Sequence, residues 1–121
     1  MASGSRSRED RLTETFAASV AAQTNAIVAG DARTGNRYAK RYILAYRQLR
    51  EMGDKGLGAL CALFVDTRPD VRAMAATFLL KYRTDEALAV LREVATMPGL
   101  VGFGASESIK RWEEGAWHLD D

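Results

Sequence analysis

The chain has 121 residues, of which 47% are hydrophobic and 27% charged, and a formal net charge of +1 at pH 7. This length and composition are typical of one globular domain with an apolar core, which excludes a disordered protein. The near-neutral net charge gives no overall attraction to nucleic acid or to membranes. A single cysteine excludes an internal disulfide and fits a reducing compartment.

The N-terminal sequence MASGSRSRED is polar and lacks the apolar stretch of a signal peptide. No stretch approaches the roughly 18 apolar residues of a transmembrane helix. We therefore expect a cytoplasmic protein with no membrane partner. Residues 1–6 are expected to form a flexible N-terminus, and residues 7–121 a single helical domain.

The first predicted helix begins after Ser7, because Ser-Arg-Glu-Asp matches a capping box, and runs to about Ala29. Gly30 and Asp31 mark its end and a cap for the next helix. The second predicted helix covers about residues 34–52. One face of it is apolar and contains Tyr38, Ala39, Tyr42, Ile43, Ala45, Tyr46, Leu49 and Met52.

The opposite face of this second helix is basic, with no acidic residue between Arg33 and Arg50. Six cations form a candidate binding surface: Arg33, Arg37, Lys40, Arg41, Arg47 and Arg50. Residues 1–55 carry ten basic and six acidic residues, whereas residues 56–121 carry seven and ten. The two parts of the sequence therefore have opposite net charges, +4 and −3.

Four further helices are predicted. The third carries Leu57, Leu60, Cys61, Phe64 and Val65, with Cys61 in the core. Pro69 starts the fourth, because its missing N–H needs no acceptor in a first helical turn. Thr84 caps the fifth, and the sixth follows the turn at Pro98 and Gly99 and runs to about Trp112. No segment alternates polar and apolar residues for long enough to predict a strand, so the fold class is all-α.

The sequence repeats with a period of 29 residues, which aligns Pro69 with Pro98 and Ala76 with Ala105. In this register Gly102 and Gly104 fall near small residues of the earlier copy, which predicts close helix contacts. Two stacked helix pairs follow, at about residues 54–82 and 84–112, with residues 113–121 as a C-terminal cap. Trp112 and Trp117 are expected either to cap the open end or to anchor a partner protein.

The segment PDVRAMAATFLLKYRTDEALAVL resembles the HEAT-like repeat, whose second helix typically reads D-x-x-V-R-x-x-A-A-x-x-L. The match is approximate, since one residue rather than two separates Asp70 from Arg72. The resemblance implies a right-handed α-α superhelix of about six helices, HEAT- or armadillo-like, with structural roles for Asp70 and Arg72. The whole chain also resembles a family of short bacterial proteins with a HEAT-like superhelix and no established activity.

The sequence GLVGFGAS, residues 99–106, comes close to the phosphate-binding loop G-x-x-x-x-G-K-[ST] but has Ala105 in place of the lysine. That loop follows a strand, whereas a helix is predicted before Gly99, so we interpret GLVGFGAS as part of a repeat helix. Ser106 lacks the final glycine of a nucleophile elbow, and His118 is the only histidine. We expect no enzymatic activity, no cofactor, no metal and no small-molecule substrate.

These expectations together favour a non-enzymatic protein-interaction module whose partner is another protein or a second copy of the chain. Nucleic-acid binding through the basic face is one alternative. An immunity-type protein that neutralises a bacterial toxin is another, by analogy alone. The ordinary interpretation of a charged helix face is solvation, or contact with an acidic segment of a second copy.

Overall fold

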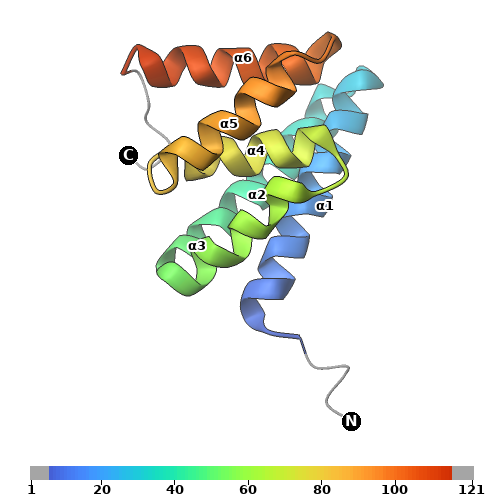
Figure 1. The fold of residues 1–121 in the computed structure, drawn as a ribbon. Coiled ribbons are helices and arrows are strands. Elements are labelled where there is room, and N and C mark those ends of the chain that lie inside the picture. Colours follow the sequence, from blue (N-terminus) through green and yellow to red (C-terminus); the bar gives the residue numbers. More distant parts are fainter. Residues whose placement is uncertain (1–5, 116–121) are drawn as a thin grey trace. The chain divides into compact units, whose positions relative to one another are not determined.

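A computed structural model describes residues 6–115. Six α-helices and one short 3-10 helix, with no strand, make up the secondary structure of this part of the chain, so the predicted all-α class is confirmed (Figure 1). The chain divides into two compact units, Met1–Ala62 and Leu63–Asp121, which are described in turn. The single domain over residues 7–121 and the right-handed superhelix stay predictions.

The first unit is a helical hairpin followed by a short helix, namely α1 (Arg8–Val28), α2 (Ala32–Glu51) and α3 (Asp54–Cys61). Ser7 caps α1 by accepting a hydrogen bond from the amide of Asp10 at 3.1 Å, as the capping box predicts. Asp31 caps α2, so this helix begins two residues before the predicted Thr34. Gly30 turns the chain between α1 and α2 with φ 77°, a left-handed conformation that suits glycine.

Aromatic and aliphatic side chains fix which face of α2 points inward. The rings of Phe16 on α1 and Tyr42 on α2 meet edge to face, with centroids 5.7 Å apart. Tyr46 and Leu49 are buried on the same side of α2. A Cβ at Gly56 would overlap the carbonyl group of Leu49, so α3 begins in close contact with the last turns of α2. The opposite face of α2 is left to solvent.

The second unit contains α4 (Pro69–Leu79), α5 (Thr84–Ala95) and α6 (Gly99–Glu113), and the 3-10 helix η1 (Ala62–Val65) leads into it. Pro69 occupies the first turn of α4, as predicted. Helix α5 contacts both α4 and α6, which also contact each other. The core of this unit is mainly aliphatic and rich in alanine, with two phenylalanines, and it includes Phe64, Val71, Ala75, Ala76, Phe78, Leu79, Leu80, Ala87, Leu91 and Val94.

Three local predictions are wrong. The third helix ends at Cys61, and Phe64 and Val65, which are expected in it, lie in the 3-10 helix that follows. Thr84 does not cap α5, because it is the first residue of the helix and its hydroxyl donates to the carbonyl of Leu80 at 2.6 Å. Cys61 is half-buried rather than buried. Arg6, expected in the flexible N-terminus, forms an ion pair with Glu14, and residues 1–5 lie outside the described part.

The 29-residue register pairs α4 with α6, and the two helices differ in burial. Ala76 and Ala105 are both buried at equivalent positions. Val71 is buried, whereas its equivalent Leu100 is 51% exposed, and Phe103 on the same helix is 64% exposed. Helix α6 therefore exposes Leu100 at the position where α4 buries Val71.

The two glycines inside α6 have different surroundings. A Cβ at Gly102 would overlap the carbonyl group of Met97, so this buried position requires glycine. Gly104 is exposed, and a Cβ there would meet no atom within 4 Å. The predicted close helix contact is therefore wrong for Gly104. Helix α5, not a strand, precedes Gly99, as the repeat interpretation of GLVGFGAS requires.

Candidate functional site

The six predicted cations of α2 lie away from the buried side of the helix. Five are exposed and Arg50 is partly exposed. Two of the six lie over tyrosine rings: the guanidinium of Arg41 is 5.1 Å from the ring centroid of Tyr38, and that of Arg50 is 5.5 Å from Tyr46. At these distances a cation is attracted to the ring face. Arg41 and Arg50 therefore have partners within α2 itself.

The other four cations share a straight row with two residues that the sequence prediction did not include. We call this row the α2 stripe, and it consists of Arg33, Arg37, Lys40, Leu44, Arg47 and Glu51. Their spacings of four, three, four, three and four residues average one helical turn. The six exposed side chains therefore follow one side of α2 over about 27 Å, at 1.5 Å rise per residue.

Leu44 and Glu51 give the stripe a character that a purely basic face would lack. Leu44 is 55% exposed and lies between Lys40 and Arg47. Glu51 is exposed at the end of the helix, one turn beyond Arg47. Helical spacing could have revealed both residues from the sequence, because each continues the three-and-four pattern set by the cations.

None of the four stripe cations makes an ion pair within residues 6–115. The only hydrogen bond of their side chains in this range joins Nη2 of Arg37 to the hydroxyl of Thr34, at 3.3 Å. Arg33, Arg37 and Lys40 lie four and three residues apart, where like charges destabilise a helix by about 0.2–0.5 kcal/mol per pair. Repulsion among Arg33, Arg37 and Lys40 therefore weakens the first half of α2, whereas Arg47 lies four residues from Glu51, a spacing at which opposite charges attract.

The N-cap of α2 positions the start of the stripe. Asp31 accepts hydrogen bonds from both the hydroxyl and the amide of Thr34, at 2.6 and 3.1 Å. These two bonds, and Arg37 nearby, hold the pKa of Asp31 below its ordinary value. These bonds hold the first turn of α2, which contains Arg33, in helical conformation.

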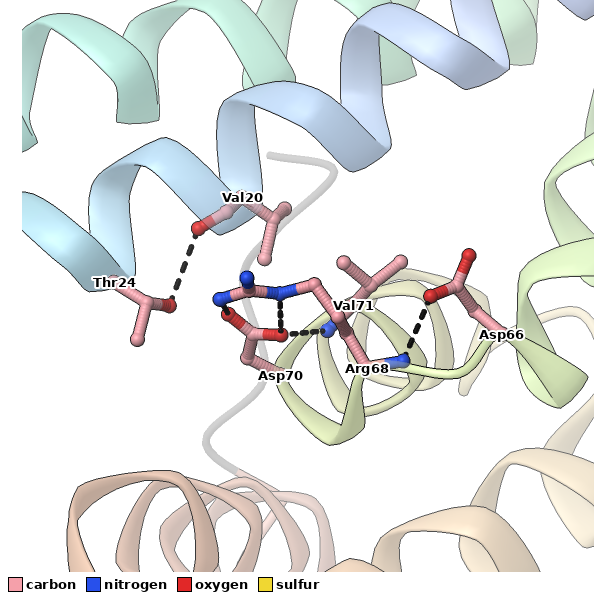
Figure 2. A network of polar contacts seen from close by, with 6 residues as sticks. All are labelled: Val20, Thr24, Asp66, Arg68, Asp70 and Val71. Carbon is pink, nitrogen blue, oxygen red and sulfur yellow. Dashed lines mark hydrogen bonds and ion pairs between the residues drawn. The ribbon is translucent and has the colours of Figure 1, made fainter.

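Two arginines of the second unit, Arg68 and Arg72, by contrast bond to acceptors close by. Arg68 donates from Nε and Nη2 to the two carboxylate oxygens of Asp70, at 3.0 and 2.9 Å (Figure 2). Asp70 is buried, also accepts from the amide of Val71, and raises the pKa of Arg68. The amide of Arg68 donates to Asp66 at 2.9 Å, so this network holds the entry to α4.

Arg72 connects three elements of the second unit. Its Nε donates to the carbonyl of Phe64 in η1 at 2.8 Å, and its Nη1 to the carboxylate of Glu93 in α5 at 2.9 Å. The hydrogen bond and the charge of Arg72 lower the pKa of Glu93. Asp70 and Arg72 thus have contacts of the structural kind that the repeat resemblance implies.

Of the two tryptophans predicted to form a cap or a partner anchor, the structure describes one. Trp112 is half-buried on α6, and Trp117 lies outside the described residues, as do the other residues from 116 to 121. The choice between a cap and a partner anchor stays a prediction.

Residues 6–115 contain no group of three or more His, Cys, Asp or Glu side chains that could hold a metal ion. No helix in that range combines the length and the apolar character needed to cross a bilayer.

The fold is shared with a solved bacterial protein. The crystal structure of the protein RPA1889 from Rhodopseudomonas palustris CGA009 matches with a TM-score of 0.85 and 18% sequence identity, over 93% of this chain and 94% of that chain. At this identity the likeness shows the fold alone. No family model matches the chain, and no curated protein matches its sequence.

Proposed function

We propose that this chain is a non-enzymatic protein-interaction module built of HEAT-like helical repeats, and that the α2 stripe is its binding surface. The observation that carries the proposal is Leu44, an exposed apolar side chain between cations that have no ion-pair partner among residues 6–115. Protein–protein interfaces commonly combine an apolar centre with a polar rim and are enriched in arginine. The stripe has this composition.

Two features of the stripe count against the nucleic-acid alternative. Binding to a phosphate backbone depends on cations that neutralise phosphates. Leu44 would offer an apolar surface to those anions, and Glu51 would repel them. A protein segment can instead bury Leu44 and neutralise both signs of charge, so a protein partner is the better fit.

The repeat architecture is supported by the relation between α4 and α6. Ala76 and Ala105 are buried at positions 29 residues apart, and Arg72 connects neighbouring elements. Helical repeats bury a continuous core by stacking and leave whole helix faces available to partners. A binding surface along one helix fits such an architecture.

Site-specific photo-crosslinking in the native host tests this proposal. The photoreactive residue p-benzoylphenylalanine replaces Leu44 in one variant and Ala89, exposed on α5, in a matched control. We expect a discrete protein adduct from position 44 and none from position 89. A nucleic-acid adduct at position 44, or the same adducts from both positions, would contradict the proposal.

A further inference from the structure

We infer that the segment that docks on the α2 stripe is an acidic α-helix whose side chains repeat the stripe's spacing with opposite charge. This inference rests on the proposed function and names the chemistry of the partner. It is carried by three properties of the stripe: its straightness, its order of charges and the position of its apolar residue.

The spacing of the stripe fits a helix better than a strand. Successive stripe residues lie on average one turn apart, which is about 5.4 Å along the axis. A helix laid alongside α2 presents side chains at the same repeat, as helices do in coiled-coil packing. Side chains on one face of a strand recur about every 6.6 Å, so a strand would be out of step by about 4 Å after three turns.

The charges of the stripe specify the charges of the partner. From Arg33 to Glu51 the stripe reads positive, positive, positive, apolar, positive, negative. The complementary helix carries three acidic residues, an apolar residue opposite Leu44, a fourth acidic residue and a basic residue opposite Glu51. Complementary charges accelerate encounter and exclude wrong partners more than they add affinity.

Leu44 and Glu51 together fix the register of the docked helix. A one-turn shift would place an acidic side chain of the partner against Leu44 or against Glu51. An acid opposite Glu51 would repel it, and a carboxylate against Leu44 would lose water without gaining a partner. Four cations alone would accept an acidic helix in several registers. Leu44 and Glu51 restrict the docked helix to one of these registers.

The first test uses fluorescence anisotropy with labelled synthetic probes and the full chain. The stripe peptide is a helix-forming peptide of about 20 residues with the complementary pattern, long enough to be helical in water. The permuted peptide has the same composition with its acidic residues spread around the helix, and the third probe is a DNA duplex. We expect the stripe peptide to bind on the order of tenfold more tightly than the permuted one, with weaker binding at high salt.

Matched charge reversals locate the binding site of the stripe peptide. The double variant Arg37→Glu/Lys40→Glu should abolish binding, whereas Arg83→Glu/Arg92→Glu, at exposed cations of the second unit, should leave it unchanged. Circular dichroism should show that both variants remain helical. Equal losses in the two variants would mean that the peptide responds to overall charge, which would overturn the inference.

A charge swap at the end of the stripe tests the register. Glu51→Lys should weaken the stripe peptide several-fold, and a peptide with glutamate at the facing position should bind this variant as tightly as the original pair. Failure of the rescue would overturn the predicted register and with it the inference.

The outcomes separate the inference from the proposed function. Equal binding of the stripe and permuted peptides, or no binding of either, overturns the acidic helix but leaves the protein adduct at position 44 as independent evidence for the interaction module. Tighter binding of the duplex than of both peptides, with loss in Arg37→Glu/Lys40→Glu, overturns both. A cross-linked partner segment that is helical and acidic at the predicted spacing supports both.

Discussion

The cations of α2 and those at the start of α4 differ in what surrounds them. Arg68 and Arg72 each donate to acceptors in their own unit, at 2.8–3.0 Å, and so take part in its structure. The stripe cations of α2 have no ion pair among residues 6–115, and Arg33, Arg37 and Lys40 repel one another along the helix. Cations of the first kind are explained by the fold, whereas the fold assigns no ion pair to cations of the second kind, for which we propose a partner outside the chain.

Replacing Arg72 should give the largest loss of stability. Arg72→Met keeps much of the side-chain volume but leaves the carbonyl of Phe64 without this donor and Glu93 without its ion pair. A buried acceptor that loses its partner costs about 1–3 kcal/mol, so we expect a loss of this size in the free energy of unfolding, measured by urea denaturation. Arg92→Met, an exposed cation on α5, is the control and should change it little. Equal losses of unfolding free energy in Arg72→Met and Arg92→Met would contradict the distinction between paired and unpaired cations.

Removing the N-cap of α2 should have the next largest effect. Asp31→Ala deletes both hydrogen bonds to Thr34, and loss of such a cap costs about 0.5–2 kcal/mol. Urea denaturation should show this loss, and hydrogen exchange should be faster in the first turn of α2. Asn36→Ala, at an exposed position of the same helix, should not produce either change. Slow exchange in the first turn of Asp31→Ala would show that the cap does not hold this turn in helical conformation.

Reversing one stripe charge should raise stability slightly. Arg37→Glu replaces repulsion with attraction toward Arg33, Lys40 and Arg41, each three or four residues away. Each attractive pair contributes about 0.2–0.5 kcal/mol, so the three pairs should raise the free energy of unfolding by about 0.6–1.5 kcal/mol. Urea denaturation at low ionic strength measures the gain, and added salt should reduce it. A clear loss of stability would mean that the fold itself uses Arg37.

The smallest expected effect is a difference in acid sensitivity. The pKa of Glu93 in the folded chain is lowered from its ordinary value of 4.5 by Arg72. Its pairing is therefore present at pH above that ordinary value and is lost as the pH falls through the lowered pKa. We expect Glu93→Gln to lose less stability than the unchanged chain between about pH 6 and pH 3. Arg37→Glu adds a carboxylate among cations, so its gain in stability should shrink over the same range. Parallel curves for the unchanged chain and Glu93→Gln would contradict the role given to Glu93.

Much of the fold follows from local signals in the sequence. Ser7, Gly30 and Pro69 mark helix boundaries because each has a specific hydrogen-bonding or conformational property that acts within one turn. The predictions fail where a contact between side chains or between helices, rather than a local property of the residue, determines its position. Threonine often caps a helix, but the hydroxyl of Thr84 donates to the carbonyl of Leu80 instead. Gly104 shares the register of a packed position but lies at the exposed side of α6, where no helix of the second unit covers it.

The candidate site was predictable in location but not in character. The basic face of α2 follows from the periodicity of its cations, and their exposure agrees with that pattern. The pairing of Arg41 and Arg50 with tyrosine rings depends on side-chain conformations that composition does not define. The exposure of Leu44 depends on which face of α2 the core selects, and that selection is made by contacts such as the one between Phe16 and Tyr42.

The most direct test of the central claim repeats the crosslinking at position 44 in two charge-reversed backgrounds. If the stripe cations bind a protein partner, the adduct should form in the otherwise unchanged chain and in Arg83→Glu/Arg92→Glu. It should disappear in Arg37→Glu/Lys40→Glu. An adduct that survives undiminished in Arg37→Glu/Lys40→Glu would contradict the claim, because the cations would then have no part in the contact.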